Sequence, residues 1–193
     1  MSQPAPKIPT HMTVAEFIAW NAPEGAGWQL VEGSPEAMAP ASRSHGSIQA
    51  ELGALISRHL AERSRPCAVV MAPGIMPRVR ADLNFRIPDL AVTCTPYTEE
   101  EHAVSDPVVI IEILSPSNKA ETWANVWTYT TIPSVAEIAV VSSTDRSAQI
   151  LRRMQDGSWP AKPELIENGD FVLGSIDFRV PLAAIYRTTR LAG

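Results

Sequence analysis

Two acidic residues lie in stretches of the chain that are otherwise apolar. Glu112 lies inside residues 107–114, an apolar and β-branched run with the length of a strand buried on both faces. Asp89 lies just before a second apolar run, Leu90 to Thr93. A buried carboxylate loses its charge unless a cation, a metal ion or several donors compensate it. Two acids at the ends of neighbouring strands can share one divalent cation. The alternative for Glu112 alone is a place at the wet end of its strand, paired with an arginine.

The strand that carries Glu112 is followed by a predicted helix and a further strand. Ser117 or Asn118 can cap the helix, and Pro133 ends it. One side of the helix carries Trp123, Val126, Trp127 and Thr130. Residues 135–141 then form another buried strand. Because a strand, helix and strand of this length form a right-handed crossover, we expect the two strands to be parallel.

The other elements are predicted from helical spacing, alternation and turn residues. The clearest helix has Ser44 as its cap and repeats apolar residues over about four turns, at Ile48, Leu52, Leu55, Ile56 and Leu60. A capping box at residues 13–16 begins an earlier helix, and a hairpin over residues 27–39 turns at Gly33. Further strands are expected at residues 68–71, 74–80, 90–93, 147–153, 163–166, 170–173 and 176–178, and a closing helix at residues 181–186.

Length and composition are those of one globular domain. We expect a disordered tail over residues 1–11 and a single domain over residues 12–193. The net charge of −5 gives no general attraction for nucleic acid, although it leaves room for a local basic groove. We expect no membrane segment and, without a signal core, a cytoplasmic location. Cys67 and Cys94 are predicted to be small apolar core residues, not a disulfide or a metal pair.

Several short motifs, taken in order, resemble the signature of one bacterial family. They are Trp28-x-Leu-Val-Glu-Gly33, His45 at a helix start, Pro88-Asp-Leu90, Glu112-Ile-Leu-Ser-Pro-Ser117 and Tyr129. This series is similar to that of the Uma-type restriction endonuclease family, a branch of the PD-(D/E)XK nuclease superfamily. The similarity covers residues 12–186. It implies an α/β fold with a restriction-endonuclease-like core, in which helices flank a mixed central sheet and the site lies at one end of its central strands.

The resemblance implies a metal-dependent DNA nuclease. Asp89 and Glu112 match the two acids of the family, and both would bind a divalent metal with help from the carbonyl of Ile113. Oxygen ligands of this kind suit Mg²⁺ or Mn²⁺ better than zinc. The two carboxylates should then lie within about 6 Å of each other.

Two further positions match the family, and each has a structural alternative. Glu32 falls on the acidic position of the hairpin motif, but it can also be a surface acid beside a turn. His45 can order the site or contact substrate, but it can also be a polar residue at a helix N-terminus. Tyr129 matches a helix position whose ring is expected to pack on the sheet.

The chain also departs from the family pattern. Gln29 stands where the family hairpin carries an acid. Leu114 stands where most of the superfamily has a lysine, and Asn125 replaces the lysine that the family supplies from the following helix, with Glu121 in place of an upstream aspartate. Without a cation near the phosphate, a large electrostatic contribution would be missing. Lys119 is the nearby candidate for this role; the alternative is a solvent-exposed helix lysine, and Asn125 is likewise expected to be exposed.

Three hypotheses follow. The chain is a metal-dependent DNA nuclease, a catalytically weakened relative that still binds metal or DNA, or an interaction module that keeps only the fold. A carboxylate in a buried strand argues against the third, because it costs stability that a pure scaffold could recover with an apolar residue. If DNA is the partner, five basic residues should lie on the side of the site: Arg43, Arg78, Arg80, Arg86 and Lys119. The sequence does not determine the oligomeric state, and a homodimer is one assembly that it allows.

Overall fold

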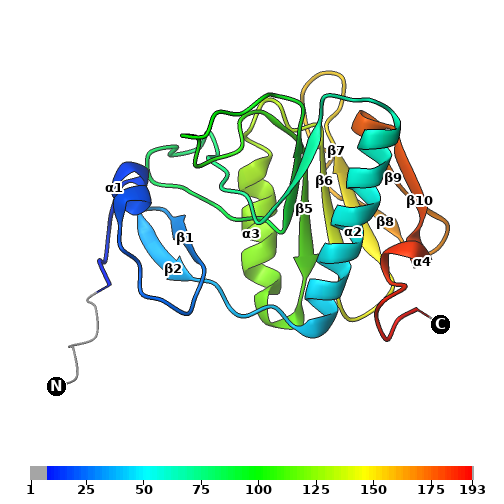
Figure 1. Cartoon of the computed structure of the whole chain (residues 1–193), viewed down its shortest axis with the longest axis horizontal. Coiled ribbons are helices and arrows are strands. Elements are labelled where there is room, and N and C mark those ends of the chain that lie inside the picture. The colour runs from blue at the N-terminus through cyan, green and yellow to red at the C-terminus, as the bar shows by residue number, and fades with distance from the viewer. Residues whose placement is uncertain (1–7, 193) are drawn as a thin grey trace.

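The computed structural model describes residues 8–192, so most of the predicted tail lies outside the described residues. The central strands are β3 (Ala68–Met71), β4 (Leu90–Thr93), β5 (Pro107–Leu114), β6 (Glu137–Ser142), β7 (Ala148–Arg152) and β8 (Glu164–Ile166). They form one sheet in the order β3-β4-β5-β6-β7-β8, of which β5 to β8 are labelled in Figure 1. Only β5 and β6 run parallel, and the other neighbouring pairs are antiparallel. The predicted mixed central sheet is therefore confirmed.

The parallel pair is joined by the predicted crossover. A short 3-10 turn, η1 (Pro116–Asn118), follows β5 and leads into α3 (Lys119–Tyr129). The helix stops before Pro133, and the chain returns as β6 beside β5. Trp127, which was expected on the packed side of the helix, is 44% exposed.

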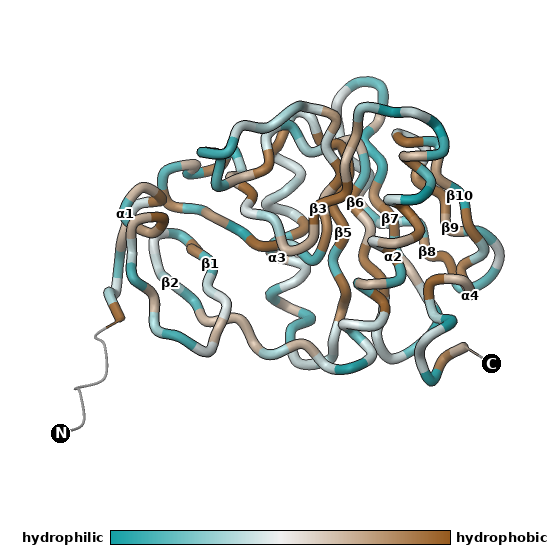
Figure 2. Tube along the Cα trace, viewed as in Figure 1, coloured by the Kyte–Doolittle hydropathy of each residue, from teal (hydrophilic) through white to brown (hydrophobic). Residues whose placement is uncertain are grey.

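Alternating residues of β5 face two different layers. Val109, Ile111 and Ile113 pack in a core with α2 (Arg43–Glu62), whereas Ile110 packs in a second core with α3. Figure 2 shows the hydrophobic residues concentrated along these central strands. Because side chains alternate along a strand, Glu112 falls on the α3 side, at the end of β5 from which α3 begins.

The start of α2 differs from the prediction by two residues. Ser42, not Ser44, is the N-cap, and its side chain accepts a hydrogen bond from the backbone N–H of His45 at 3.2 Å. A serine hydroxyl in this position satisfies one of the unpaired N–H groups of the first turn. His45 is therefore fixed in the first turn of the helix, at its N-terminal end.

The remaining elements lie around the two layers. They are α1 (Val14–Ala19), the hairpin β1 (Trp28–Val31) and β2 (Ser34–Ala37), the hairpin β9 (Asp170–Leu173) and β10 (Phe178–Pro181) with η2 (Gly174–Ile176) between its strands, and α4 (Leu182–Ile185). The capping box of α1 and the turn of the first hairpin are as predicted. Residues 176–178, predicted as a strand, instead end η2 and begin β10.

The strand predicted at residues 74–80 is wrong. Within it, Ile75 makes an isolated bridge with Arg86, and no named strand is formed. Pro77 has no N–H to donate to a ladder, which explains why pairing does not continue. Among the described residues, none of the helices combines the length and the apolar character needed to cross a membrane.

The prediction for the two cysteines is also wrong, because Cys67 and Cys94 form a disulfide. The register explains the bond. Ala68 of β3 pairs with Thr93 of β4, so the next residues outward, Cys67 and Cys94, stand opposite each other. The sequence places each cysteine beside a strand, but only the antiparallel pairing of those strands brings the two sulfur atoms together.

Reduction of this disulfide should destabilise the protein. Release of a loop with a sequence separation of 27 residues corresponds to about 3.5 kcal/mol of unfolding free energy in the chain-entropy description. Urea unfolding with and without reductant measures the loss, and the double variant Cys67→Ala/Cys94→Ala serves as the control that reductant should not affect. An unchanged wild-type midpoint in reductant would contradict the bond. Because disulfides are rare in the cytosol, the cysteine redox state in cells also tests the predicted cytoplasmic location.

Candidate functional site

The strand register brings the two predicted acids together. Leu90 pairs with Ile111 in the antiparallel β4–β5 ladder. One step further along the ladder, Asp89 stands opposite Glu112. Residues directly opposite each other in such a ladder have Cβ atoms about 4.5–5.5 Å apart and lie on the same face. The sheet thus holds both carboxyl groups side by side, and both line the same pocket.

The side chain of Asp89 is held by two donors. His45 Nε2 lies 2.6 Å from Asp89 Oδ1, and the backbone N–H of Ile113 donates to Asp89 Oδ2, also at 2.6 Å. The Asp89 carbonyl accepts from Gln49 Nε2 at 2.8 Å and from the Ala72 N–H at 2.9 Å. His45 and Gln49 both come from the first turns of α2. The predicted ordering role of His45 is thus consistent with its contact, which fixes the orientation of the Asp89 carboxylate.

Glu112 lies in a far less compensated environment. It is 7% exposed, and its hydrogen bond among the described side chains comes from the hydroxyl of Tyr129, at 2.9 Å. Burial, together with the negative charge of Asp89, raises the pKa of Glu112 well above its usual value. Tyr129 does more than pack on the sheet, because its hydroxyl fixes one oxygen of Glu112.

A second buried glutamate has a carboxylate whose charge is fully compensated by hydrogen-bond donors. Glu137, at the start of β6, is 3% exposed. Its carboxylate accepts from Arg152 Nε at 3.0 Å, from the N–H groups of Gly174 and Ser175, and from the Ser175 hydroxyl. Glu112 has one neutral donor and a neighbouring acid instead. Of these two buried glutamates, Glu112 is the one that an added cation would stabilise.

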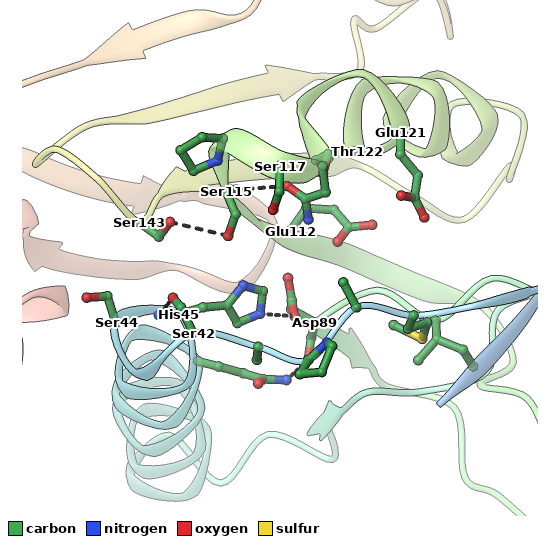
Figure 3. A pocket seen from close by; sticks show the side chains of 18 of the residues that line it. Ser42, Ser44, His45, Asp89, Glu112, Ser115, Ser117, Glu121, Thr122 and Ser143 are labelled. Carbon is green, nitrogen blue, oxygen red and sulfur yellow. Dashed lines mark hydrogen bonds and ion pairs between the residues drawn. The ribbon is translucent and has the colours of Figure 1, made fainter. Parts of the chain in front are cut away.

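The pocket around the two acids encloses about 550 Å³. Figure 3 shows two facing walls: one contains the start of α2 with Ser42, Ser44 and His45, and the other contains the end of β5 and the start of α3. The His45–Asp89 contact lies on the first wall (Figure 3). The lining is rich in hydroxyl groups, from Ser42, Ser44, Ser115, Ser117, Thr122, Ser143 and Thr144.

One face of α3 is tied to three separate segments of the chain. Glu121, Asn125 and Tyr129 follow one another at intervals of four residues and so lie on one side of the helix. Their partners are Gln29, which donates to Glu121 at 2.7 Å, Arg86, which donates to Asn125 at 2.9 Å, and Glu112, which accepts from Tyr129. Gln29, Glu121 and Asn125 also line the pocket. Asn125 is 7% exposed, so its predicted exposure on the helix is wrong.

Three residues predicted for the site are not among those that line the pocket: Glu32, Lys119 and Ile113, of which Ile113 still contacts Asp89 through its backbone N–H. Glu32 turns to Arg80, with which it forms an ion pair, and to Asn84, which donates to it at 3.1 Å. These contacts lower the pKa of Glu32, with the Asn84 hydrogen bond as the largest cause. Lys119 begins α3 but does not reach the pocket lining either. The positions of Glu32 and Lys119 fit the structural alternatives for both residues.

The five basic residues expected on the side of the site do not line the pocket itself. Arg43, Arg78, Arg80, Arg86 and Lys119 are all absent from the pocket lining. Within residues 8–192, the one Lys or Arg that lines it is Arg190, in the turn after α4. Sequence reasoning missed Arg190 because nothing local signals it. The segment that carries it follows Tyr186, whose hydroxyl shares its hydrogen between the carbonyls of Ser142 and Ser147, at 3.0 and 2.8 Å.

The donor set at the two acids fits a hard divalent cation. Leu114 directs its carbonyl towards the β6 side, where it accepts from the Ser143 N–H at 2.9 Å. Successive carbonyls of a strand alternate in direction, so the Ile113 carbonyl points towards the β4 side, the side of Asp89. Within the described part of the chain, no group of three or more His, Cys, Asp or Glu side chains could hold a metal. Two carboxylates and one carbonyl suit Mg²⁺, which keeps several waters and binds through one or two carboxylates.

Comparison with known proteins identifies a family and a similar fold. A model of the family Uma2, described as putative restriction endonuclease, matches residues 14–179. The fold is similar to the crystal structure of a putative nuclease belonging to DUF820 from Anabaena variabilis ATCC 29413, with a TM-score of 0.72 and 16% sequence identity over 91% of this chain and 97% of that chain. No curated protein matches the chain. Since the family model matches most of its length, the chain belongs to the Uma2 family of putative restriction endonucleases.

Proposed function

We propose that this protein is a metal-dependent DNA endonuclease that hydrolyses phosphodiester bonds at Asp89 and Glu112. The observation that carries the proposal is the environment of Glu112, a buried carboxylate that faces a second carboxylate and receives one neutral donor. A buried acid with a strongly perturbed pKa, in a pocket and beside a specific charged partner, is typical of catalytic sites. The family description and the described nuclease of similar fold support the same reaction class.

The cofactor of this reaction would be Mg²⁺ or Mn²⁺. Asp89, Glu112 and the carbonyl of Ile113 would hold it, since the two carboxylates line the pocket and the backbone of Ile113 contacts Asp89 through its N–H. Bound there, the ion would provide a water of lowered pKa and stabilise the charge that develops on the scissile phosphate. His45 and Tyr129 hold the two carboxylates in place, so the ligands do not have to be reoriented when the ion binds.

The substrate would be DNA that lies across the pocket mouth. A volume of about 550 Å³ is that of a small-molecule site, so only the scissile phosphate and its neighbours would enter. The hydroxyl groups of the lining offer donors to phosphate oxygens, and the positive end of the α2 dipole faces the same space. These groups, and not a basic surface, would attract the phosphate and so oppose the repulsion between DNA and a protein with a net charge of −5.

A nuclease assay tests the proposal. Single-stranded, duplex and branched DNA would be incubated with wild-type protein in Mg²⁺, Mn²⁺ and EDTA, beside Asp89→Asn. We expect cleavage that requires the metal and is lost in Asp89→Asn. Metal-independent cleavage, or full activity of the variant, would contradict it. DNA binding without cleavage would identify a catalytically weakened relative instead.

Arg190 should contribute to DNA binding. Arg190→Ala should weaken binding, with Ca²⁺ in place of Mg²⁺, and should reduce the slope of log K against log salt by about 0.9, the value for one phosphate contact. Fluorescence anisotropy over a salt series measures both effects. The matched control is Arg179→Ala, because Arg179 is an exposed arginine of β10, paired with Asp170 and outside the pocket lining. Equal slopes for the two variants would exclude a phosphate contact at Arg190.

A further inference from the structure

Asn125 presents its amide nitrogen to the pocket. The side chain lines the pocket from α3, and its Oδ1 accepts a hydrogen bond from Arg86 Nη1 at 2.9 Å. A guanidinium has only donors, so the amide oxygen must face Arg86 and Nδ2 must point away from it. Among residues 8–192, Nδ2 makes no hydrogen bond to a protein acceptor and is not sealed from solvent. Arg86 therefore fixes the orientation of the amide through its oxygen, and the amide nitrogen remains free to donate a hydrogen bond into the pocket.

Arg86 is an unusual cation for its surroundings. It is 5% exposed, and its two hydrogen bonds go to the amide oxygens of Asn125 and Asn84, each at 2.9 Å. Within the described chain its Nε is buried without a partner, and no carboxylate lies in salt-bridge contact with it. Buried arginines are normally paired with acids. Burial lowers the pKa of Arg86, but a guanidinium keeps its charge at neutral pH.

The charge of Arg86 therefore acts on the pocket through Asn125. A hydrogen bond from a cation is stronger than one between neutral groups, and it polarises the group that accepts it. The Nδ2 hydrogens of Asn125 should then be better donors than those of a solvent-exposed amide. On the same helix face, four residues later, Tyr129 contacts Glu112, so Asn125 belongs to the wall that holds this acid.

The pocket needs such a donor if a phosphodiester is to enter it. Among residues 8–192, its lining contains three acids, Asp89, Glu112 and Glu121, against one arginine, Arg190. Arg190 comes from the turn after α4, which Tyr186 anchors to the ends of β6 and β7. Asn125 instead comes from the α3 wall, where Glu112 and Glu121 are, and it brings positive potential there without another exposed charge.

We infer that Asn125 is a catalytic residue that donates a hydrogen bond to an oxygen of the reacting phosphate, and that Arg86 is the positioning residue that orients and polarises its amide. The inference rests on the proposed nuclease function and names the group that takes the place of a lysine in it. No bond is made or broken at either residue. Their contribution is the stabilisation of negative charge on the phosphate as the phosphodiester is cleaved.

Variants of Asn125 test the donor. Asn125→Ala removes the amide without adding charge, whereas Asn125→Asp keeps an oxygen for Arg86 and replaces the donor by an acceptor. Loss of one well-placed donor typically lowers kcat by about 10²–10³. We expect a loss of this size in both variants, with a smaller change in KM. A purely structural Asn125 predicts instead that Asn125→Asp is stable and active, because its contact with Arg86 is kept.

Variants of Arg86 test whether its charge acts on the phosphate through the Asn125 amide. Arg86→Met removes the charge and keeps most of the stem, and Arg86→Lys restores a cation. We expect Arg86→Met to lower kcat by about 10–100-fold, as for other residues that orient a functional group, and Arg86→Lys to recover part of it. In the double variant Arg86→Met/Asn125→Ala the two losses should not multiply, because both act through one amide. Assays are run well below the melting temperature of each variant, so that lost folding is not counted as lost catalysis.

The outcomes separate this inference from the proposed function. Wild-type kcat in Asn125→Ala, with cleavage still dependent on Glu112, overturns the inference and leaves the nuclease function standing. Independent, multiplying losses at the two positions overturn the role of Arg86. A wild-type protein that binds DNA but does not cleave it also overturns the inference, because the pair would then fail to complete the site. Absence of both binding and cleavage overturns the inference and the proposed function together.

Discussion

Replacement of Glu112 by glutamine should abolish cleavage and, in metal-free buffer, stabilise the protein. We expect metal-dependent cleavage to fall more than about 100-fold, beyond the loss typical of residues that only orient a metal ligand. The stability gain has a separate cause. A glutamine oxygen can still accept from Tyr129, while the burial of a carboxylate beside Asp89 no longer opposes folding.

The stability gain of Glu112→Gln should depend on pH, and the raised pKa of Glu112 determines the direction of that dependence. In the unfolded chain Glu112 ionises near 4.5, whereas in the folded protein its raised pKa keeps the proton bound to higher pH. Between these two pKa values the folded state binds more protons, so the free energy of unfolding of the wild type falls as the pH rises. Glutamine does not ionise. The stability difference between variant and wild type should therefore grow from about pH 4.5 upward.

Glu137→Gln is the matched control for this experiment. It replaces another buried glutamate, which accepts hydrogen bonds from Arg152, Gly174 and Ser175. Here the change leaves Arg152 without its buried partner, so stability should fall while activity of the folded protein is kept. Thermal unfolding from pH 4 to 8, with and without Mn²⁺, measures both variants, and only proteins that retain Glu112 should be stabilised by the metal. A destabilised Glu112→Gln, or one still stabilised by Mn²⁺, would contradict the metal site.

Asn125→Lys should unfold much of the protein instead of improving it. From the sequence alone, a lysine here is expected to supply the missing cation at a surface position. In the structure, the new ammonium would lie in a buried site against the Arg86 guanidinium, where the amide oxygen now accepts a hydrogen bond. An uncompensated buried charge typically costs about 3–5 kcal/mol of unfolding free energy.

Removal of the opposing charge should reverse this loss. In Arg86→Met/Asn125→Lys one cation replaces another, so we expect stability to recover and metal-dependent cleavage to exceed that of Arg86→Met alone. Urea unfolding of the four proteins in the cycle gives the coupling free energy between the two positions, which should be several times the value of about 0.5 kcal/mol for independent sites. Additive effects would mean that residues 86 and 125 do not interact.

Local patterns predicted much of this fold. The β-branched run of β5, the helical spacing of α2 and the crossover through α3 each follow from short stretches of sequence. The pairing of Asp89 with Glu112 also follows, because an acid in an apolar run is conspicuous and because neighbouring strands bring their ends together. Such features can be predicted because the spacing of apolar residues within one short segment is enough to indicate its secondary structure and its buried side.

The features that the sequence did not predict depend on contacts between distant segments. Glu32 turns to Arg80 and Asn84, some 50 residues later, and not to the pocket. The buried Asn125 accepts a hydrogen bond from Arg86, which lies outside any helix or named strand. The disulfide depends on the register of two strands. In each case the residue types were visible, but the partner was set by tertiary packing.

The face of α3 that carries Glu121, Asn125 and Tyr129 has a consequence for how this sequence can evolve. Each of these residues is hydrogen-bonded to a different segment. The effect of a substitution on the helix therefore depends on which residue stands at the partner position. We expect strong epistasis between positions 86 and 125. A lysine at 125 would be accessible only after residue 86 has lost its charge, and a lineage that takes the two steps in the opposite order would pass through a poorly folded intermediate.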